Sequence, residues 1–353
     1  MGGSHRSHRW WLLTVAPRAV AVSSIAVAVA GLVAPPASAA PMLPAPPLDP
    51  AAMVAQVGPA VVNIDAQMGY QSATGAGTGI VLDPSGIVLT NNHVVAGATD
   101  LKAFSVGNGQ TYDVDVIGFD RNHDVAVVQL RGASDLPAAN IGNSSRLNIG
   151  DPVVAMGNAG GQGGTPSAVP GRVTALNQTV SAADELTGST ETLTNMIQAD
   201  TAIRPGDSGG PMVNAAGQVI GMNTAASDNY KFGGQGFAIP IDQAMAIAGQ
   251  IRSGTSSNTV HVGPTAFMGV GVVNHDGGGA QVAQVLEGTP AADIGIARND
   301  IITSVNGRPV NSPTDLTDVL DQHHPGDTVT LSWVSPISGN HTASLALMPG
   351  PVG

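Results

Sequence analysis

Cysteine is absent from this chain of 353 residues, which excludes disulfide bonds, thiolate metal sites and a cysteine nucleophile. Positive charge is scarce: 13 Lys and Arg residues stand against 25 Asp and Glu residues, for a formal net charge of −12. A surface of this sign repels phosphate backbones, so no nucleic acid partner is expected. Beyond the first 40 residues, no apolar run is long enough to cross a bilayer.

Glycine and proline are abundant instead, with 46 and 25 copies, while only 11% of the residues are charged. This composition favours short strands joined by many turns over long charged helices. Hydrophobic residues make up 42% of the chain, which is too many for a disordered protein. The length allows two globular domains, each with a core of its own.

The N-terminus has the pattern of a secretory signal peptide, predicted over residues 1–39. Three arginines and no acidic residue occur in this segment, and an uncharged run extends from Ala19 to Val33. Ala37-Ser38-Ala39 supplies the small residues that a signal peptidase requires. The run is shorter than the roughly 20 residues that span a bilayer; an uncleaved anchor is the alternative. We therefore expect Sec-type export to the cell envelope or the medium, followed by a Pro-rich linker over residues 40–50.

Short apolar runs, interrupted by glycine and turn residues, continue through residues 51–252. Runs of four to six residues rich in valine and isoleucine predict an all-β sandwich or barrel. Asp83-Pro84-Ser85-Gly86 predicts a hairpin turn between two of these runs. A helix is predicted from Pro240 to about Arg252, because apolar residues recur there with a period near 3.6.

A polar segment over residues 253–262 is predicted to be a linker, and residues 263–349 are predicted to form a second, smaller domain. Strand-like runs alternate there with two helix starts, Thr289-Pro290 and Ser312-Pro313. In each pair a hydroxyl residue is placed to cap the helix and a proline occupies its first position. The mixture predicts a small α+β domain.

The segment around Ser208 reads RPGDSGGP and predicts a nucleophile. A serine hydroxyl attacks only when a base takes its proton and when donors face the developing oxyanion. Glycine at position 206 allows a backbone turn in which the amides of Gly206 and Ser208 converge on one oxygen. The plain alternative is a glycine-rich turn without catalytic function.

A base and an orienting carboxylate are expected upstream of the nucleophile. His93 follows a strand-like run in TNNHVV, and Asp124 precedes another in HDVAVVQL. Either residue alone is more often structural. The order His93, Asp124, Ser208 is that of chymotrypsin-like proteases and differs from subtilisin and the α/β-hydrolases. A lipase or esterase is disfavoured, because its serine usually lies in G-x-S-x-G.

These three segments resemble the catalytic blocks of the HtrA/Deg family of serine proteases, and within that family the secreted PepA-type proteases of mycobacteria. The resemblance implies a chymotrypsin-like double β-barrel followed by a PDZ domain. It implies a catalytic triad of His93, Asp124 and Ser208 and an oxyanion hole of Gly206 and Ser208 with Asp207 nearby. By the same resemblance, the specificity pocket is lined by Ala202, Asn223 and Thr224.

The C-terminal segment resembles a PDZ domain, which binds the C-terminus of a peptide as an added strand. Phe267, Met268, Gly269 and Val270 stand where the family has its carboxylate-binding loop; the alternative is a first strand and its entry. The expected partners are unfolded or partly folded proteins, peptide substrates and peptide C-termini. No cofactor is expected, and no metal, because the histidines lack the spacing of metal ligands.

Two features depart from the family pattern. Asp207 stands where many HtrA proteins have asparagine. Residues 40–60 lack the aromatic residues that trimeric members use, so a homo-oligomer is a possible partner but a trimer is not predicted. The predicted function is that of a secreted endopeptidase, and the alternative is a peptide-binding chaperone or adaptor with weak or latent proteolysis.

Overall fold

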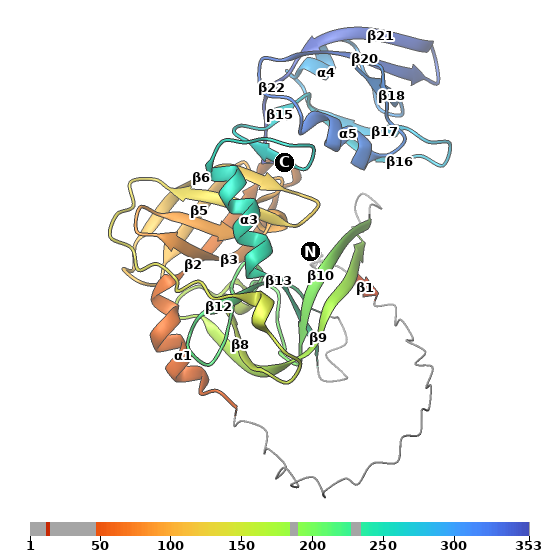
Figure 1. Ribbon diagram of the computed structural model, residues 1–353. Coiled ribbons are helices and arrows are strands. Elements are labelled where there is room, and N and C mark those ends of the chain that lie inside the picture. The colour runs from red at the N-terminus through yellow and green to blue at the C-terminus, as the bar shows by residue number, and fades with distance from the viewer. Residues whose placement is uncertain (1–11, 15–46, 184–189, 227–233, 353) are drawn as a thin grey trace, which may run out of the picture.

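The computed structural model describes residues 12–14, 47–183, 190–226 and 234–352, and it is mostly β as predicted (Figure 1). Of the predicted signal peptide, only Leu12–Thr14 lies within these ranges, as strand β1 paired with the end of β9. The rest of that segment and most of the predicted linker over residues 40–50 lie outside the described residues.

The first barrel is closed by pairing in the order β6-β5-β2-β3-β4-β7, with β7 returning to β6. Its strands are β2 (Val61–Met68), β3 (Ala73–Asp83), β4 (Ile87–Thr90), β5 (Asp100–Ser105), β6 (Thr111–Asp120) and β7 (Val125–Leu130). The predicted turn at residues 83–86 joins β3 to β4, where Gly86 has a φ of 89°. This confirms the predicted hairpin.

The second barrel closes in the order β9-β10-β13-β12-β11-β8, with β8 pairing back to β9. Its strands are β8 (Pro152–Gly157), β9 (Ser167–Ala183), β10 (Thr190–Ala199), β11 (Pro211–Val213), β12 (Val219–Ala226) and β13 (Gly236–Pro240). Helix α1 (Pro50–Val57) precedes the barrels, and α3 (Ile241–Arg252) follows them where a helix was predicted. The remaining short helices are α2 (Asn92–Val95), η1 (Gly58–Ala60), η2 (Gly69–Gln71), η3 (Ser144–Arg146) and η4 (Ala159–Gly161).

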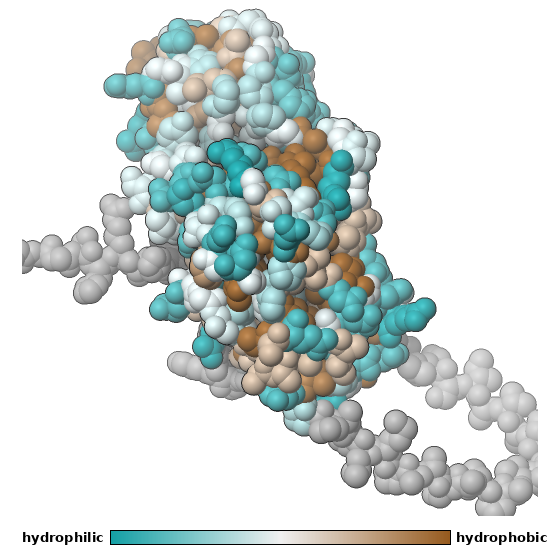
Figure 2. Space-filling model, turned by 90° about the vertical axis from the view of Figure 1, so that its left-hand side faces the viewer, coloured by the Kyte–Doolittle hydropathy of each residue, from teal (hydrophilic) through white to brown (hydrophobic). Residues whose placement is uncertain are grey.

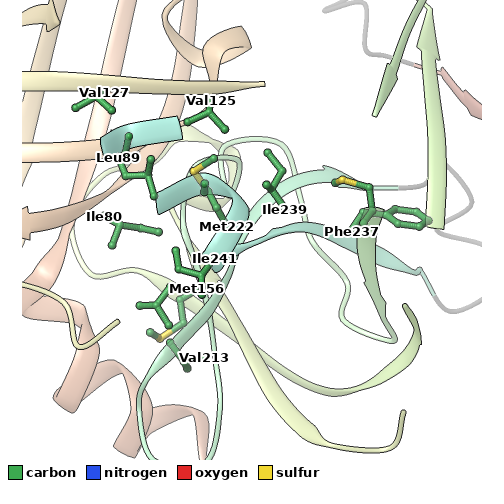
Figure 3. Packing of buried hydrophobic residues seen from close by; sticks show 14 of the residues in the cluster. Ile80, Leu89, Val125, Val127, Met156, Val213, Met222, Phe237, Ile239 and Ile241 are labelled. Carbon is green, nitrogen blue, oxygen red and sulfur yellow. The ribbon is translucent and has the colours of Figure 1, made fainter. Parts of the chain in front are cut away.

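The largest apolar cluster lies where the two barrels meet (Figure 3). Leu89 and Val127 enter it from the first barrel, and Met222 and Ile239 enter it from the second. Each barrel also has an apolar cluster in its interior. Strand β7 contributes to the junction cluster through Val127 and to the interior cluster of the first barrel through Val128. Burial of both faces joins the barrels rigidly, which places loops from each at a common edge.

The predicted linker over residues 253–262 is only partly a linker. It ends in β14 (Val260–Val262), which pairs with β6 of the first barrel and buries Val260 in the junction cluster. The run Val-His-Val is too short to indicate a strand from its sequence. The predicted start of the second domain, residue 263, therefore directly follows a strand that belongs to the first barrel.

The C-terminal domain is a small α+β unit with its own core, as predicted. Its main sheet has the order β16-β17-β18-β20-β21. The elements are β15 (Ala266–Phe267), β16 (Val270–Asn274), β17 (Ala280–Val285), α4 (Pro290–Asp293), β18 (Ile301–Val305), β19 (Arg308–Pro309), α5 (Pro313–Leu320), β20 (Thr328–Ser335), β21 (Gly339–Ala346) and β22 (Met348–Pro349).

The face shown in Figure 2 is hydrophilic with separate hydrophobic patches. Such patches are ordinary, because apolar atoms supply more than half of the accessible surface of a folded protein. Within the described ranges, the helices are all too short or too polar to span a membrane.

Candidate active site

His93 and Asp124 lie on neighbouring elements of the first barrel and contact each other directly. His93 is in α2, which follows β4, and Asp124 is the last residue before β7. The Nδ1 atom of His93 lies 2.9 Å from Oδ2 and 3.0 Å from Oδ1 of Asp124. The backbone amide of His93 also donates to Oδ1, at 3.0 Å. The imidazole and its partner carboxylate are therefore held by both side-chain and backbone contacts.

The Asp124 carboxylate is buried, and its side chain is 4% exposed against 27% for the side chain of His93. Its backbone has a φ of 54°, which is uncommon for a residue other than glycine. The side-chain amide of Asn91 donates to the Asp124 carbonyl at 2.9 Å, and the Thr224 hydroxyl donates to its carboxylate. Donors from both barrels thus set the direction in which this carboxylate points.

The contacts of the pair determine which imidazole nitrogen can act as a base. A carboxylate only accepts hydrogen bonds, so the tautomer that satisfies the pair carries its proton on Nδ1. The Nε2 atom then keeps its lone pair. A histidine held in this way can take a proton from a hydroxyl and return it later to a leaving group.

Ser208 lies in the loop between β10 and β11 of the second barrel. Its hydroxyl donates to the Thr224 carbonyl at 3.2 Å, and its own carbonyl accepts from the Thr78 amide at 2.8 Å. Thr224 contacts Ser208 through its backbone and Asp124 through its hydroxyl. The structure thus brings Ser208 and Asp124 together through one residue, although they are 84 positions apart in the sequence.

The turn before Ser208 requires glycine for a steric reason. Gly206 has a φ of 94°, and a Cβ atom there would lie 2.1 Å from the carbonyl oxygen of Asn158. The carbonyls of Pro205 and Gly206 accept from the Gly160 amide at 2.6 Å and the Thr78 hydroxyl at 2.7 Å. With both carbonyls engaged, the turn keeps one backbone orientation.

The amides of this turn differ in their availability to a substrate. Neither the Gly206 nor the Ser208 amide donates to another residue within the described part of the chain. The Asp207 amide donates to the Arg204 carbonyl at 3.0 Å. The prediction placed Asp207 with the oxyanion-hole residues. In the structure its N–H is already used by this internal hydrogen bond, so Asp207 does not supply an oxyanion donor. Gly206 and Ser208 can supply two converging donors.

Comparisons with known proteins agree with this geometry. The trypsin-like peptidase domain family matches residues 77–222, and the PDZ domain family matches residues 266–334. The serine protease PepD of Mycobacterium tuberculosis is 37% identical over 332 residues, which cover 88% of this chain and 69% of PepD. This chain belongs to the HtrA/Deg family of serine endopeptidases.

Two further HtrA/Deg proteins are similar to this chain. The periplasmic pH-dependent serine endoprotease DegQ of Escherichia coli is 35% identical over 272 residues, covering 74% of this chain and 57% of DegQ. A solved structure of the HtrA-type protease AlgW with a tripeptide has a TM-score of 0.50 at 28% identity. It covers 86% of this chain and 99% of the AlgW chain.

Two residues predicted to line the specificity pocket of this HtrA/Deg protease have other positions. Asn223 is fully buried, and its side-chain amide donates to the Met156 carbonyl at 3.0 Å inside the barrel. Thr224 directs its hydroxyl to Asp124. Asn223 and Thr224 are neighbours on β12, and each side chain makes a hydrogen bond inside the protein. Neither side chain is therefore free to line a pocket. Ala202 is half-buried beside Gly234, and residues 227–233 lie outside the described ranges.

Sequence reasoning missed the part that Thr78 has in this HtrA/Deg protease. Its amide, hydroxyl and carbonyl contact Ser208, Gly206 and the Thr90 hydroxyl. The Asn158 amide donates to the Thr78 hydroxyl at 2.8 Å. The only signal in the sequence is a single hydroxyl residue among the glycines of GAGTG, which read as a glycine-rich strand.

The residues predicted for the carboxylate-binding loop divide into two groups. Gly269 has a φ of 92°, and Val270 opens β16 at the edge of the sheet. Met268 is buried in the core of the domain, and Phe267 stacks on Tyr70 of the first barrel with ring centroids 5.5 Å apart. The edge of β16 is open to an added strand within the described residues, which is how PDZ domains receive a peptide.

Among the described residues, no group of three His, Asp or Glu side chains could hold a metal ion. The two histidines noted in the sequence have other contacts. His323 lies against Asn306, and Nε2 of His324 lies 2.9 Å from the Val262 carbonyl.

Proposed function

We propose that this HtrA/Deg protease cleaves peptide bonds with Ser208 as nucleophile, His93 as general base and acid, and Asp124 as the group that orients the imidazole. The 2.9 Å contact between His93 Nδ1 and Asp124 carries the proposal, because it leaves Nε2 as the basic atom. The contacts of Thr224 with both Ser208 and Asp124 support the same assignment.

The reaction follows from these roles. Ser208 Oγ attacks the substrate carbonyl while its proton passes to Nε2 of His93, and the carbonyl oxygen becomes an oxyanion facing the Gly206 and Ser208 amides. The C–N bond then breaks, and His93 gives its proton to the departing amine. Water, deprotonated by the same imidazole, releases the acyl group from Ser208 and restores the enzyme.

The substrates we propose are unfolded or partly folded proteins, because the scissile bond must reach the junction of the barrels as an extended segment. We also propose that the PDZ domain binds peptide C-termini along the open edge of β16, with the amides after Phe267 facing the carboxylate. The small-residue site at Ala37-Ser38-Ala39 supports export. N-terminal sequencing of the exported protein should then find a chain that starts at Ala40, not at Met1.

The decisive experiment compares the wild type with Ser208→Ala on denatured casein. We expect the variant to lose activity by more than about 10³-fold, since the nucleophile is absent while the oxyanion donors remain. Ser85→Ala is the matched control: it removes an exposed serine hydroxyl that donates to the Asp83 carboxylate and has no part in the proposed site. Equal casein hydrolysis by Ser208→Ala and the wild type would reject Ser208 as nucleophile.

A further inference from the structure

The PDZ domain contacts the first barrel through an ion pair with a residue of the turn that carries Asp124. Arg121, in the turn between β6 and β7, donates from Nε and Nη2 to the carboxylate of Asp321 at 3.0–3.3 Å. Asp321 directly follows helix α5. The two side chains are only 20% and 17% exposed, so water screens this pair less than an exposed one.

The turn that carries Arg121 also carries Asp124. The Asp124 amide donates to the Arg121 carbonyl at 3.1 Å, which closes the turn. At its start, the buried Asp120 carboxylate accepts from the amide of His123 at 3.1 Å and lies 2.8 Å from its Nδ1. Asp124 ends the turn in a positive-φ conformation. A shift of the Arg121 backbone would therefore alter the direction of the Asp124 carboxylate.

Further contacts hold Asp321 against the barrel. His261 of β14 is buried, and its ring lies between those of Phe119 and His324, at centroid distances of 5.0 and 5.1 Å. Its Nδ1 atom lies 2.6 Å from the Asp321 carbonyl. Figure 1 shows the PDZ domain on the side of the first barrel where β6 lies. Asp321 is thus bound to the barrel through both its carboxylate and its backbone.

We propose that Arg121 and Asp321 are positioning residues for catalysis: through this ion pair, the PDZ domain holds the turn that places Asp124 against His93. The inference rests on the proposed function, because it assumes that Asp124 orients the catalytic imidazole. It makes the PDZ domain part of the support of the active site. A movement of the PDZ domain would reach Asp124 through the four residues from Arg121 to Asp124.

The test measures peptide hydrolysis by the full chain with Arg121→Ala and with Asp321→Asn, per active site titrated with a fluorophosphonate. We expect kcat to fall about tenfold with KM nearly unchanged, because a small misplacement of a catalytic group costs rate more than binding. The acidic limb of the kcat/KM profile should move to lower pH, since the imidazolium loses part of its carboxylate partner. Arg121→Lys, which keeps the charge, should retain most of the rate.

The matched control is Arg131→Ala. Arg131, which directly follows β7, pairs with Asp115 of β6 in the same barrel, and both side chains are more than half exposed. We expect its rate and pH profile to equal those of the wild type. Combining Arg121→Asp with Asp321→Arg should recover part of the lost rate.

Two results would overturn the inference: a pH profile of Asp321→Asn identical to that of Arg131→Ala, or a loss of activity explained wholly by fewer titrated sites. Because Asp321 lies outside the barrels, the Asp321→Asn variant still tests the inference if Arg121→Ala fails to fold. Ser208→Ala separates the two proposals. If it stays active, the proposed function fails; if it is inactive while Asp321→Asn behaves as the wild type, only the positioning role fails.

Discussion

Asp207 is a buried carboxyl held by neutral donors. Its two oxygens accept from the Ser167 hydroxyl at 3.0 Å and the Arg204 amide at 2.8 Å. Burial raises the pKa of the Asp207 carboxyl, and these hydrogen bonds with the charge of Arg204 offset only part of that rise. The folded protein therefore keeps a proton on Asp207 at pH values where the unfolded chain has lost it. This contribution to stability is fully present in acid and is lost as the pH rises through the raised pKa.

Asp207→Asn should remove this loss. Asparagine can accept from the Arg204 amide and donate to the Ser167 hydroxyl, which still donates to the Gly157 carbonyl at 3.1 Å. Relative to the wild type, the variant should gain stability as the pH rises from the ordinary aspartate pKa of about 4 to the raised pKa of Asp207, by at most about 1.4 kcal/mol per pH unit. Urea unfolding at several pH values measures the difference.

The control for this prediction is Asp65→Asn, which changes an exposed carboxyl on β2. A stability difference between Asp207→Asn and the wild type that stays constant across the pH series would contradict the account. So would a larger gain in acid than at neutral pH, because the sign of the linkage would then be reversed.

At the scale of elements, strand and turn signals predicted most of the fold. The run Val125-Ala126-Val127-Val128 predicted a strand, and the structure shows why it is continuously apolar: alternate residues face the barrel junction and the barrel interior. Periodicity cannot separate these two faces, since both are buried. The segment that became β14 was missed because the burial of its residues comes from distant parts of the chain, among them β6, α3 and the PDZ residue His324.

Two similar helix starts show where local signals suffice. The Ser312 hydroxyl accepts from the Asp315 amide at 3.1 Å, as the cap before Pro313 predicted. Before Pro290, the Thr289 hydroxyl instead donates to the Leu286 carbonyl at 2.7 Å, and α4 has only four residues. Gly269 packs closely against Thr289, so the Thr289 hydroxyl lies in a packed site. Sequence spacing predicted both helices, but tertiary contacts decided how each hydroxyl is used.

The candidate site divides in the same way. The His93–Asp124 contact, and the link from Asp124 to Ser208 through Thr224, agree with the predicted triad, because the proposed chemistry demands particular residue types in a particular order. Asn223 and Thr224 were misplaced, because the direction of each side chain depends on the register of β12 inside a closed barrel. That register is a property of the assembled sheet, and no local pattern at residues 223–224 reports it.

At the scale of the whole molecule, the protease and PDZ units have separate cores. Residues 266–347 supply the buried cluster of the PDZ domain, while the buried residues of the barrel clusters all come before position 263. Half-buried Val352 packs against the cluster inside the first barrel. The units meet at the Arg121–Asp321 pair, at the stacked rings of Tyr70 and Phe267, and where Val352 exchanges backbone hydrogen bonds with Gly97 and Ala98. Each unit should therefore fold when the other is removed.

Deleting residues 263–353 should leave the barrels folded. Circular dichroism should then show a cooperative thermal unfolding transition for the truncated chain. The truncated chain keeps β14 but loses the partner of Arg121, so we expect peptide hydrolysis to fall about tenfold, as in Asp321→Asn.

Binding of a labelled peptide with a free C-terminal carboxylate, measured by fluorescence anisotropy, should disappear with the deletion. The full chain should bind the same peptide about tenfold more weakly when its C-terminus is amidated, since loop amides then lack an anionic partner. Equal binding by the full and truncated chains would place the peptide site on the barrels, and the open edge of β16 would then need another partner.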